Sequence, residues 1–166
     1  MNSMTDQPPL IGPDCPTSLN RLDVPAARMA LAVLISAPRN CALAIAREIA
    51  GTSGEDGVVI VHAADTIGFR SALSRAAAGF DRLRAVVIQD VDALNRDQQA
   101  ALKGTLEHLA LEGAAGCRIL ATTSVPLFDL VSAGVFDARL FYGLNAVHIM
   151  SDAVRAHDRP GEITKN

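Results

Sequence analysis

The sequence predicts a single α/β domain in which a parallel β-sheet is covered by helices. Short apolar runs at 31–36, 57–62, 84–90 and 117–123 alternate with longer segments of helical composition, and this alternation is typical of parallel sheets. Of the 166 residues, 49% are hydrophobic, yet only 4% are aromatic and none is Trp. The core must therefore be built mainly from Ala, Val, Leu and Ile, which suits helices packed on a sheet.

The two ends of the chain differ in composition from its middle. Residues 1–27 combine polar side chains with five prolines, and proline in a helix interior removes a hydrogen bond and clashes with the preceding turn. We therefore expect a Pro-rich N-terminal arm at 1–27, the α/β domain at 28–150 and a flexible tail at 151–166. The prolines of the arm are Pro8, Pro9, Pro13, Pro16 and Pro25.

In the first half of the domain, two strands are expected to alternate with two helices. The strands are 31–36 and 57–62, both of which read as buried because apolar residues follow one another without alternation. The helices are 42–50, rich in Ala and Leu, and 66–79, which ends on Gly79. Glycine is a natural stop for a helix because it adopts the left-handed conformation at little cost.

The second half contains the clearest strand, 84–90, in which four apolar residues are bounded by polar ones. Asn95 can cap a following helix that runs to Leu111. Two more strands are expected at 117–123 and 146–149. Three polar residues of the helix are expected to face outward: Gln98, Gln99 and Lys103.

Charge and cysteine content exclude several classes of function. The net charge is −3 and no run of five basic residues occurs, which disfavours broad attraction to nucleic acid or anionic lipid. Cys15, Cys41 and Cys117 are odd in number and lack CxxC spacing, so neither a disulfide framework nor a zinc site is indicated. No apolar run is long enough to span a bilayer. A reducing cytoplasm is the expected location.

Ligands of open parallel sheets bind at the carboxyl ends of the strands, so the residues after each apolar run are the informative ones. The segment 36–42 follows the first strand, where a phosphate-binding loop needs glycines and a Lys. It contains neither, although Arg39 could contact an anion. The only lysines of the chain are Lys103 and Lys165. A structural loop is the favoured interpretation.

The strand 84–90 ends in Gln89 and Asp90, followed by Asp92. A nucleotide hydrolase needs one acid here for Mg²⁺ and a second group to position water, so only part of the set is present. Six His and Ser side chains stand alone as candidates, and packed or surface roles are favoured over catalysis for them. These candidates are His62, His108, His148, Ser36, Ser53 and Ser124.

The segment 134–149 reads GVFDARLFYGLNAVHI and resembles the stretch GxFRxDLYYRLNVxxI of sigma-54-dependent activators, a branch of the AAA+ ATPases. The segment 118–124, RILATTS, resembles the sensor I strand of that family. Leu10–Gly12 and Val33–Ile35 resemble its N-terminal L-I-G and the strand before its phosphate loop. This resemblance implies a three-layer P-loop NTPase-like AAA+ core, here without a lid subdomain, over the domain at 28–150.

The departures from the family fall on its functional positions. The resemblance places the Walker A glycine and lysine on Cys41 and Ala42, and the Walker B acids on Gln89 and Asp90. The sensor Asn becomes Ser124. The two arginines that the family directs at a neighbouring subunit fall on Asp137 and Gly143, and the GAFTGA loop that engages sigma-54 has no counterpart between 58 and 87. The degenerate pocket positions are thus Ser36, Arg39, Cys41, Ala42, Gln89, Asp90 and Ser124.

The resemblance and its departures together predict a catalytically inactive AAA+-like protein that regulates transcription through protein contacts. No metal or cofactor is expected, and ATP with Mg²⁺ would bind only if the degenerate pocket survives. The alternatives are a functional ATP-binding sigma-54-dependent activator and a non-hydrolysing subunit of a clamp-loader-like ring. The expected partner is a protein, such as a sigma-54 activator or a related ATPase, and neither a membrane nor specific nucleic acid.

The segment 128–142 holds four of the six aromatic residues of the chain. Aromatic side chains are favoured anchors of protein interfaces, although ordinary core packing beneath the last strand explains them equally well. The sequence therefore predicts an interface in this part of the chain. Its candidate residues are Phe128, Phe136, Asp137, Phe141, Tyr142 and Gly143.

Overall fold

The computed structural model describes residues 23–51, 57–79, 82–111 and 117–151, which form one five-stranded parallel sheet with helices on both faces. The strands are β1 (Ala32–Ser36), β2 (Val58–His62), β3 (Ala85–Gln89), β4 (Arg118–Thr123) and β5 (His148–Met150). The helices are α1 (Asp23–Met29), α2 (Arg39–Ala50), α3 (Thr66–Ala77), α4 (Arg96–Leu111), α5 (Leu127–Ser132) and α6 (Ala138–Leu144), with a single 3-10 turn, η1 (Val91–Ala93).

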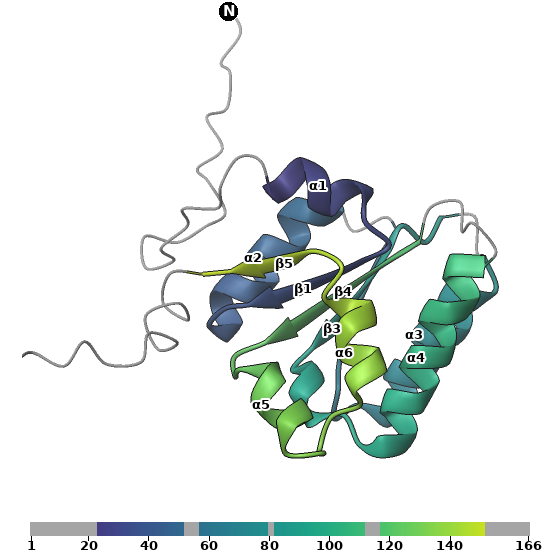
Figure 1. Cartoon of the computed structure of the whole chain (residues 1–166). Coiled ribbons are helices and arrows are strands. Elements are labelled where there is room, and N and C mark those ends of the chain that lie inside the picture. The colour runs from purple at the N-terminus through teal and green to yellow at the C-terminus, as the bar shows by residue number, and fades with distance from the viewer. Residues whose placement is uncertain (1–22, 52–56, 80–81, 112–116, 152–166) are drawn as a thin grey trace, which may run out of the picture.

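The helices divide into two layers around the sheet. Figure 1 shows α1 and α2 on one face and α3, α4 and α6 on the other. Successive residues of β1 point to opposite faces, so Leu34 joins the core beneath α3, α4 and α6 while Val33 and Ile35 join the core beneath α2. The helical face of α2 is rich in small residues, whereas the opposite core holds Phe and Leu side chains. The three layers of the fold match the α/β architecture expected from the sequence.

The strand order is β2-β3-β4-β1-β5, and every pair is parallel. In this register Ser36 of β1 lies opposite Thr123 of β4, and His62 of β2 lies opposite Gln89 of β3. The carboxyl ends of these four strands therefore meet at one edge of the sheet. That edge holds most of the polar side chains discussed below.

The strands start and end within two residues of the positions expected from the sequence. One expectation about burial was wrong: β2, read as a buried strand, is an edge strand with Ile60 exposed. A run of apolar residues is compatible with an edge strand here because helix α3 covers one face of it. Gly79, expected to stop a helix, has φ 64° two residues after the end of α3.

Three helices were not anticipated, and one of them corrects a domain boundary. Helix α1 (Asp23–Met29) begins inside the predicted arm 1–27, and Ala27 is fully buried against the α2 side of the sheet. Pro25 lies in the first turn, where its missing N–H would have no helical partner anyway, so it does not break the helix. The short helices α5 and α6 fall in the segment for which only an interface was predicted.

The capping of α4 was predicted correctly, but the burial of its glutamines was not. Asn95 Oδ1 accepts from Gln98 N–H at 2.9 Å, and Gln98 Oε1 accepts from Asn95 N–H at 3.0 Å, which forms a reciprocal capping box. Gln98 and Gln99 are buried rather than outward-facing, because their amides also donate to backbone carbonyls of neighbouring segments. Lys103 is partly exposed.

Candidate functional site

The connection from β1 to α2 is only two residues long. Strand β1 ends at Ser36 and helix α2 begins at Arg39, which leaves Ala37 and Pro38 between them. Ala37 N–H donates to Thr123 O at 3.0 Å, which ties the turn to β4. A phosphate-binding loop requires a longer, glycine-rich stretch whose free N–H groups surround the phosphates. This turn offers no such stretch.

Two of the expected pocket positions lie in the core instead of at the edge of the sheet. Cys41 and Ala42 are each 2% exposed and pack in the core beneath α2. They are buried because α2 starts as early as Arg39, so both residues already lie on the helical face that meets the sheet. Leu10–Gly12 and Ser53 lie outside the described residues.

Asp90 directly follows β3 and occupies a special position in the backbone. Its φ of 53° and ψ of 54° place it in the left-handed region, and within the described residues it is the only non-glycine residue with positive φ. Asp tolerates this region better than most residues because its short polar side chain can bond locally. The turn directs the carboxylate back over the edge of the sheet, where the side chain is only 6% exposed.

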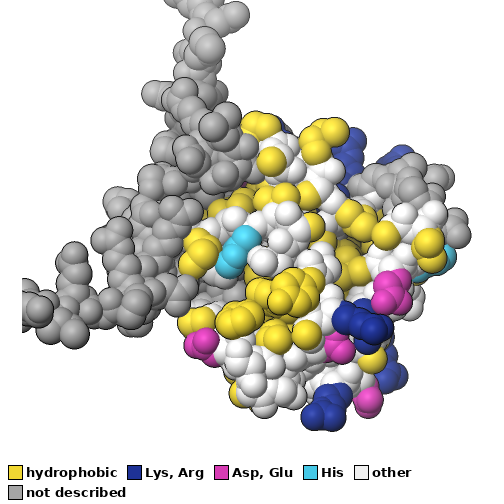
Figure 2. Space-filling view, in the orientation of Figure 1, with side chains coloured by type: hydrophobic (Ala, Val, Ile, Leu, Met, Phe, Trp, Pro, Cys, Tyr) yellow, Lys and Arg dark blue, Asp and Glu magenta, His cyan; other side chains and the backbone are white. Residues whose placement is uncertain are grey.

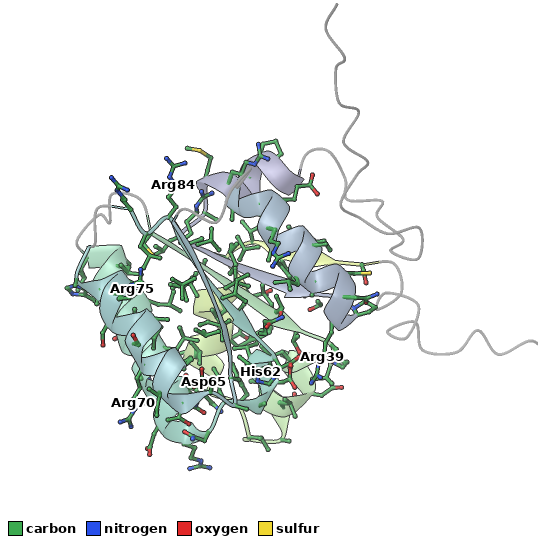
Figure 3. The ribbon with its side chains drawn as sticks, turned by 180° about the vertical axis from the view of Figure 1, so that it is seen from behind. Arg39, His62, Asp65, Arg70, Arg75 and Arg84 are labelled. Carbon is green, nitrogen blue, oxygen red and sulfur yellow. The ribbon has the colours of Figure 1, made fainter. Side chains whose placement is uncertain are left out.

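Arg39 and His62 share this carboxylate. The guanidinium of Arg39 donates from Nε to Asp90 Oδ1 at 3.0 Å and pairs through Nη2 with Oδ2 at 2.9 Å, which is a two-pronged contact. His62 Nε2 lies 2.6 Å from the same Oδ2. The other ring nitrogen, Nδ1, accepts from Ala64 N–H at 3.0 Å, so the ring proton belongs on Nε2. Figure 3 shows Arg39 and His62 at the same edge of the sheet.

A second pair of polar side chains lies at the end of β4. Thr123 Oγ1 donates to Asp92 Oδ1 at 2.8 Å and accepts from Val125 N–H at 3.2 Å. Thr123 is buried, whereas Ser124, the residue at the sensor position, is exposed. Thr123 is therefore the inward-facing polar residue at this strand end.

Ser36, the remaining pocket position, is buried at the end of β1. Its Oγ lies 2.8 Å from Nε2 of His148, which belongs to the neighbouring strand β5. Sequence reasoning missed the roles of His62, Thr123 and His148. Each of these side chains acquires its partner only through the strand register, and no spacing along the chain signals that register.

The carboxylate of Asp90 is already engaged by neighbouring side chains at this edge of the sheet. Both carboxylate oxygens already accept from Arg39 or His62. Gln89, at the other Walker B position, is neutral and partly exposed. Within the described residues, no group of three His, Cys, Asp or Glu side chains is arranged to hold a metal ion. Asp90 is the only buried acid in the part of the chain that the structure describes, and Arg39 neutralises its carboxylate.

The aromatic residues of the expected interface divide into two classes. Phe128 and Tyr142 are 56% and 65% exposed, while Phe136 and Phe141 are buried. The ring of Phe141 contacts both exposed rings, with centroid distances of 6.0 Å to Phe128 and 5.3 Å to Tyr142. Figure 2 shows hydrophobic side chains gathered on this face of the molecule, where α5 and α6 meet. Phe141 thus supports the exposed pair from below.

Asp137 and Gly143, the positions of the family's two arginines, lie at the two ends of α6. Asp137 is the N-cap of α6: its Oδ1 accepts from Leu140 N–H at 2.8 Å, and its Oδ2 lies 3.4 Å from Lys103 Nζ. The backbone hydrogen bond from Leu140, assisted by the positive charge of Lys103, lowers the pKa of Asp137. Gly143 is exposed, and a Cβ there would only reach ordinary contact with Leu106, at 3.7 Å.

The strand order and the helix layers define a P-loop NTPase-like AAA+ core, in which only Ala37 and Pro38 connect β1 to α2. The family model for the sigma-54 interaction domain matches residues 23–151. The chain therefore belongs to the sigma-54 interaction domain family. No curated protein matches the sequence.

Several solved structures share this fold. NtrX from Brucella abortus in complex with ADP is 18% identical with a TM-score of 0.57; the match covers 82% of this chain and 37% of that one. Domain III of the replication initiation protein DnaA from Thermotoga maritima is 13% identical, with a TM-score of 0.55 and coverages of 86% and 64%. The P-loop NTPase domain of a sigma-54 transport activator from E. coli is 16% identical, with a TM-score of 0.53 and coverages of 79% and 90%.

At these identities the likeness shows the fold and nothing finer. The chain spans 37% of the length of the NtrX chain. Among the described helices, none combines the length and the apolar character needed to cross a membrane.

Proposed function

We propose that this protein is a non-hydrolysing member of the sigma-54 interaction domain family that acts through protein contacts in the regulation of transcription. The observation that carries the proposal is the two-residue connection between β1 and α2, together with the Arg39 guanidinium seated on Asp90. These features occupy the place where an active relative needs a glycine loop, a lysine and a magnesium ion.

The first argument concerns phosphate. Catalysis of phosphoryl transfer depends on positioning and on charge stabilisation by donors and cations around the phosphates. Here the lysine position is Ala42, which is buried in the core, and the turn before α2 has no glycine. Among the described residues, Arg39 is the basic side chain next to the turn, and it already holds Asp90. These features argue against binding of a triphosphate, which needs open backbone N–H groups and a free cation.

The second argument concerns the metal. Mg²⁺ would need at least one free carboxylate at this edge of the sheet. The carboxylate of Asp90 is buried and accepts from two side chains, so a cation would have to displace Arg39 and His62 first. The other Walker B position is Gln89, which carries no charge for a hard cation. The geometry therefore favours a structural role for Asp90.

The exposed aromatic pair supports a function in docking. Phe128 and Tyr142 are held in place from below by Phe141, and rigid, half-exposed aromatic rings are favoured interface anchors. The proposed partner is a protein such as a sigma-54 activator or a related ATPase. Because Asp137 and Gly143 stand where the family has arginines, a mixed assembly containing this protein would have incomplete ATP sites and lower ATPase activity.

The first experiment tests for nucleotide chemistry. Purified protein is incubated with Mg-ATP, and phosphate release is compared with that of the Asp90→Ala variant; calorimetry with millimolar Mg-ATP and Mg-ADP runs in parallel. We expect equal, background rates and no saturable heat. An Asp90-dependent rate, or saturable binding, would show instead a nucleotide-dependent activator.

The second experiment tests for regulation of a partner. Each sigma-54 activator of the host is assayed for ATPase activity with increasing amounts of this protein. We expect dose-dependent inhibition that the Phe128→Ser, Tyr142→Ser double variant weakens, since the change removes two exposed rings and leaves the core intact. Unchanged activity for every activator would remove the support for this partner.

A further inference from the structure

A second polar feature lies away from the sheet edge, in a pocket between α4 and the connection from α5 to α6. Its cavity volume is about 270 Å³. One wall is a single stripe of α4 formed by Arg96, Gln99, Ala100 and Lys103, spaced three and four residues apart. The facing wall is the segment Gly134–Asp137. Figure 2 shows basic and acidic side chains gathered beside the hydrophobic patch, over the lower end of α4.

The two walls of the pocket are joined by a buried side chain. Gln99 is only 4% exposed. Its Nε2 donates to Leu94 O at 2.8 Å and to Val135 O at 3.2 Å, and its Oε1 accepts from Asp137 N–H at 2.8 Å. The amide thus holds the segment before α6 at a fixed distance from α4. The pocket is therefore formed before any ligand arrives, which lowers the entropy cost of binding.

The charge of the lining favours a negative ligand. Arg96 is exposed at the first residue of α4, and no hydrogen bond or ion pair engages its side chain within the described part of the chain. Lys103 contacts Asp137 at 3.4 Å, a long and half-exposed pair that contributes little and can open. Two cations and one anion line the pocket, which leaves one positive charge unpaired.

The remaining surface of the pocket is apolar. Ala100 and Val135 are exposed beside the charged groups, and Phe136 is buried behind Val135. A ligand that pairs with Arg96 therefore places its neighbouring group against aliphatic surface. An isolated phosphate would leave this surface uncovered, and a doubly charged group would also be repelled by the Asp137 carboxylate. A singly charged carboxylate next to an aliphatic side chain fits both parts of the lining.

We propose that this pocket binds an acidic segment of a partner protein, in which Asp or Glu pairs with Arg96 and an adjacent aliphatic side chain packs on Ala100 and Val135. This inference deepens the proposed function, on which it rests, by giving the chemistry of the partner. Lys103 supplies a second contact when it leaves Asp137. Gln99 is a positioning residue, since it holds the wall that carries Val135.

The test uses peptide selection, because the partner itself is unidentified. A random twelve-residue phage library is selected on the wild-type protein and counter-selected on the Arg96→Glu variant. We expect enriched sequences that contain Asp or Glu next to Leu, Ile or Val. A fluorescein-labelled synthetic copy of the strongest sequence should bind the wild type saturably. Its affinity for Arg96→Glu should be lower by about tenfold or more, as expected for the loss of one charge-assisted contact.

Matched variants separate this pocket from general electrostatics. Arg70→Glu and Arg75→Glu make the same charge change on α3, at two arginines that Figure 3 labels and that do not line the pocket. Both should leave peptide affinity within about twofold of the wild type. Lys103→Gln should weaken binding less than Arg96→Glu. Thermal unfolding checks that each variant is folded, and a Glu at the first residue of a helix is itself favourable.

Three results would overturn the proposal: no enriched acidic sequence, equal peptide affinity for wild type and Arg96→Glu, or displacement of the peptide by inorganic phosphate or single-stranded DNA at lower concentration than by unlabelled peptide. The last result would assign the pocket to phosphate groups. None of these assays contains ATP. A failure here is therefore distinguishable from a failure of the proposed lack of hydrolysis, which rests on the sheet edge alone.

Discussion

Replacing Asp90 with Ala should reveal whether this carboxylate stabilises the fold or is kept for chemistry. The change removes an acceptor for His62, and a hydrogen bond to a charged group contributes about 1.5–3 kcal/mol when buried. Because His62 is 42% exposed, we assign about 1 kcal/mol of stability to its hydrogen bond with Asp90. The guanidinium of Arg39 is 74% exposed, so its pair with Asp90 contributes only about 0.5 kcal/mol.

The backbone adds to this loss. At φ 53° Ala is less tolerant of the left-handed region than Asp, which costs about 0.5–1 kcal/mol more. We therefore expect Asp90→Ala to lower the free energy of unfolding by about 2–2.5 kcal/mol, which corresponds to a fall in Tm of about 4–10 °C for a domain of this size. Asp90→Asn retains an acceptor and tolerates the left-handed region, so its effect should be about half as large.

Thermal and urea unfolding at pH 7 measure the effect, with Glu107→Ala as the control because it removes an exposed carboxylate from the middle of α4. The control should stay within about 0.5 kcal/mol of the wild type. Active-site acids in working enzymes are often held at a cost, so their removal tends to stabilise. An unchanged or higher Tm for Asp90→Ala would therefore refute the structural role of the Asp90 carboxylate.

Two further predictions concern Asp137 and Cys117. Asp137→Ala removes the N-cap of α6 and should cost about 1 kcal/mol of stability at pH 7, with Asp137→Asn costing less. The hydrogen bond from Leu140 lowers the pKa of Asp137 in the folded state below its usual 3.8. The ionised carboxylate therefore stabilises the fold above that pH, and this stabilisation disappears as the pH falls through the lower pKa of the folded state. A Tm difference between wild type and Asp137→Ala that grows toward pH 2 would contradict this. Burial raises the pKa of the Cys117 thiol, despite the positive charge of Arg118. Iodoacetamide at pH 8 should therefore label Cys117 far more slowly in native protein than in urea, and mass spectrometry of the peptides measures both labelling rates. Equal rates would show that the thiol is accessible.

The strands were predictable because their signal is local. The run at 84–90 contains four consecutive apolar residues between polar ones, and in the sheet β3 lies between two neighbours with both faces covered. The cap at Asn95 was equally local, since a capping side chain bonds to residues three positions away. Short helices such as α5 and α6 give no comparable signal, because six or seven residues show too little of the helical period.

The contacts of the site were beyond sequence reasoning. The sequence identified Arg39 and Asp90 as isolated candidates, but their pairing spans 51 positions and depends on the order of the strands. His62 reaches the same carboxylate because β2 and β3 are neighbours in register. The burial of Gln99 could not be foreseen either, since its amide is satisfied by carbonyls from two different segments.

The early start of α2 has a consequence for any attempt to build a nucleotide site in this chain. At Ala42, where the sequence resemblance places the family's phosphate-binding lysine, the side chain faces aliphatic neighbours and is 2% exposed. An ammonium group introduced there would be buried without a partner, at a cost of several kcal/mol. A longer glycine loop before α2 would not bring residue 42 out of the core while α2 keeps this register. A change of register would displace every side chain that α2 packs on the sheet. A lysine introduced at position 42 in this register would therefore lower the stability of the fold before it could contact a phosphate.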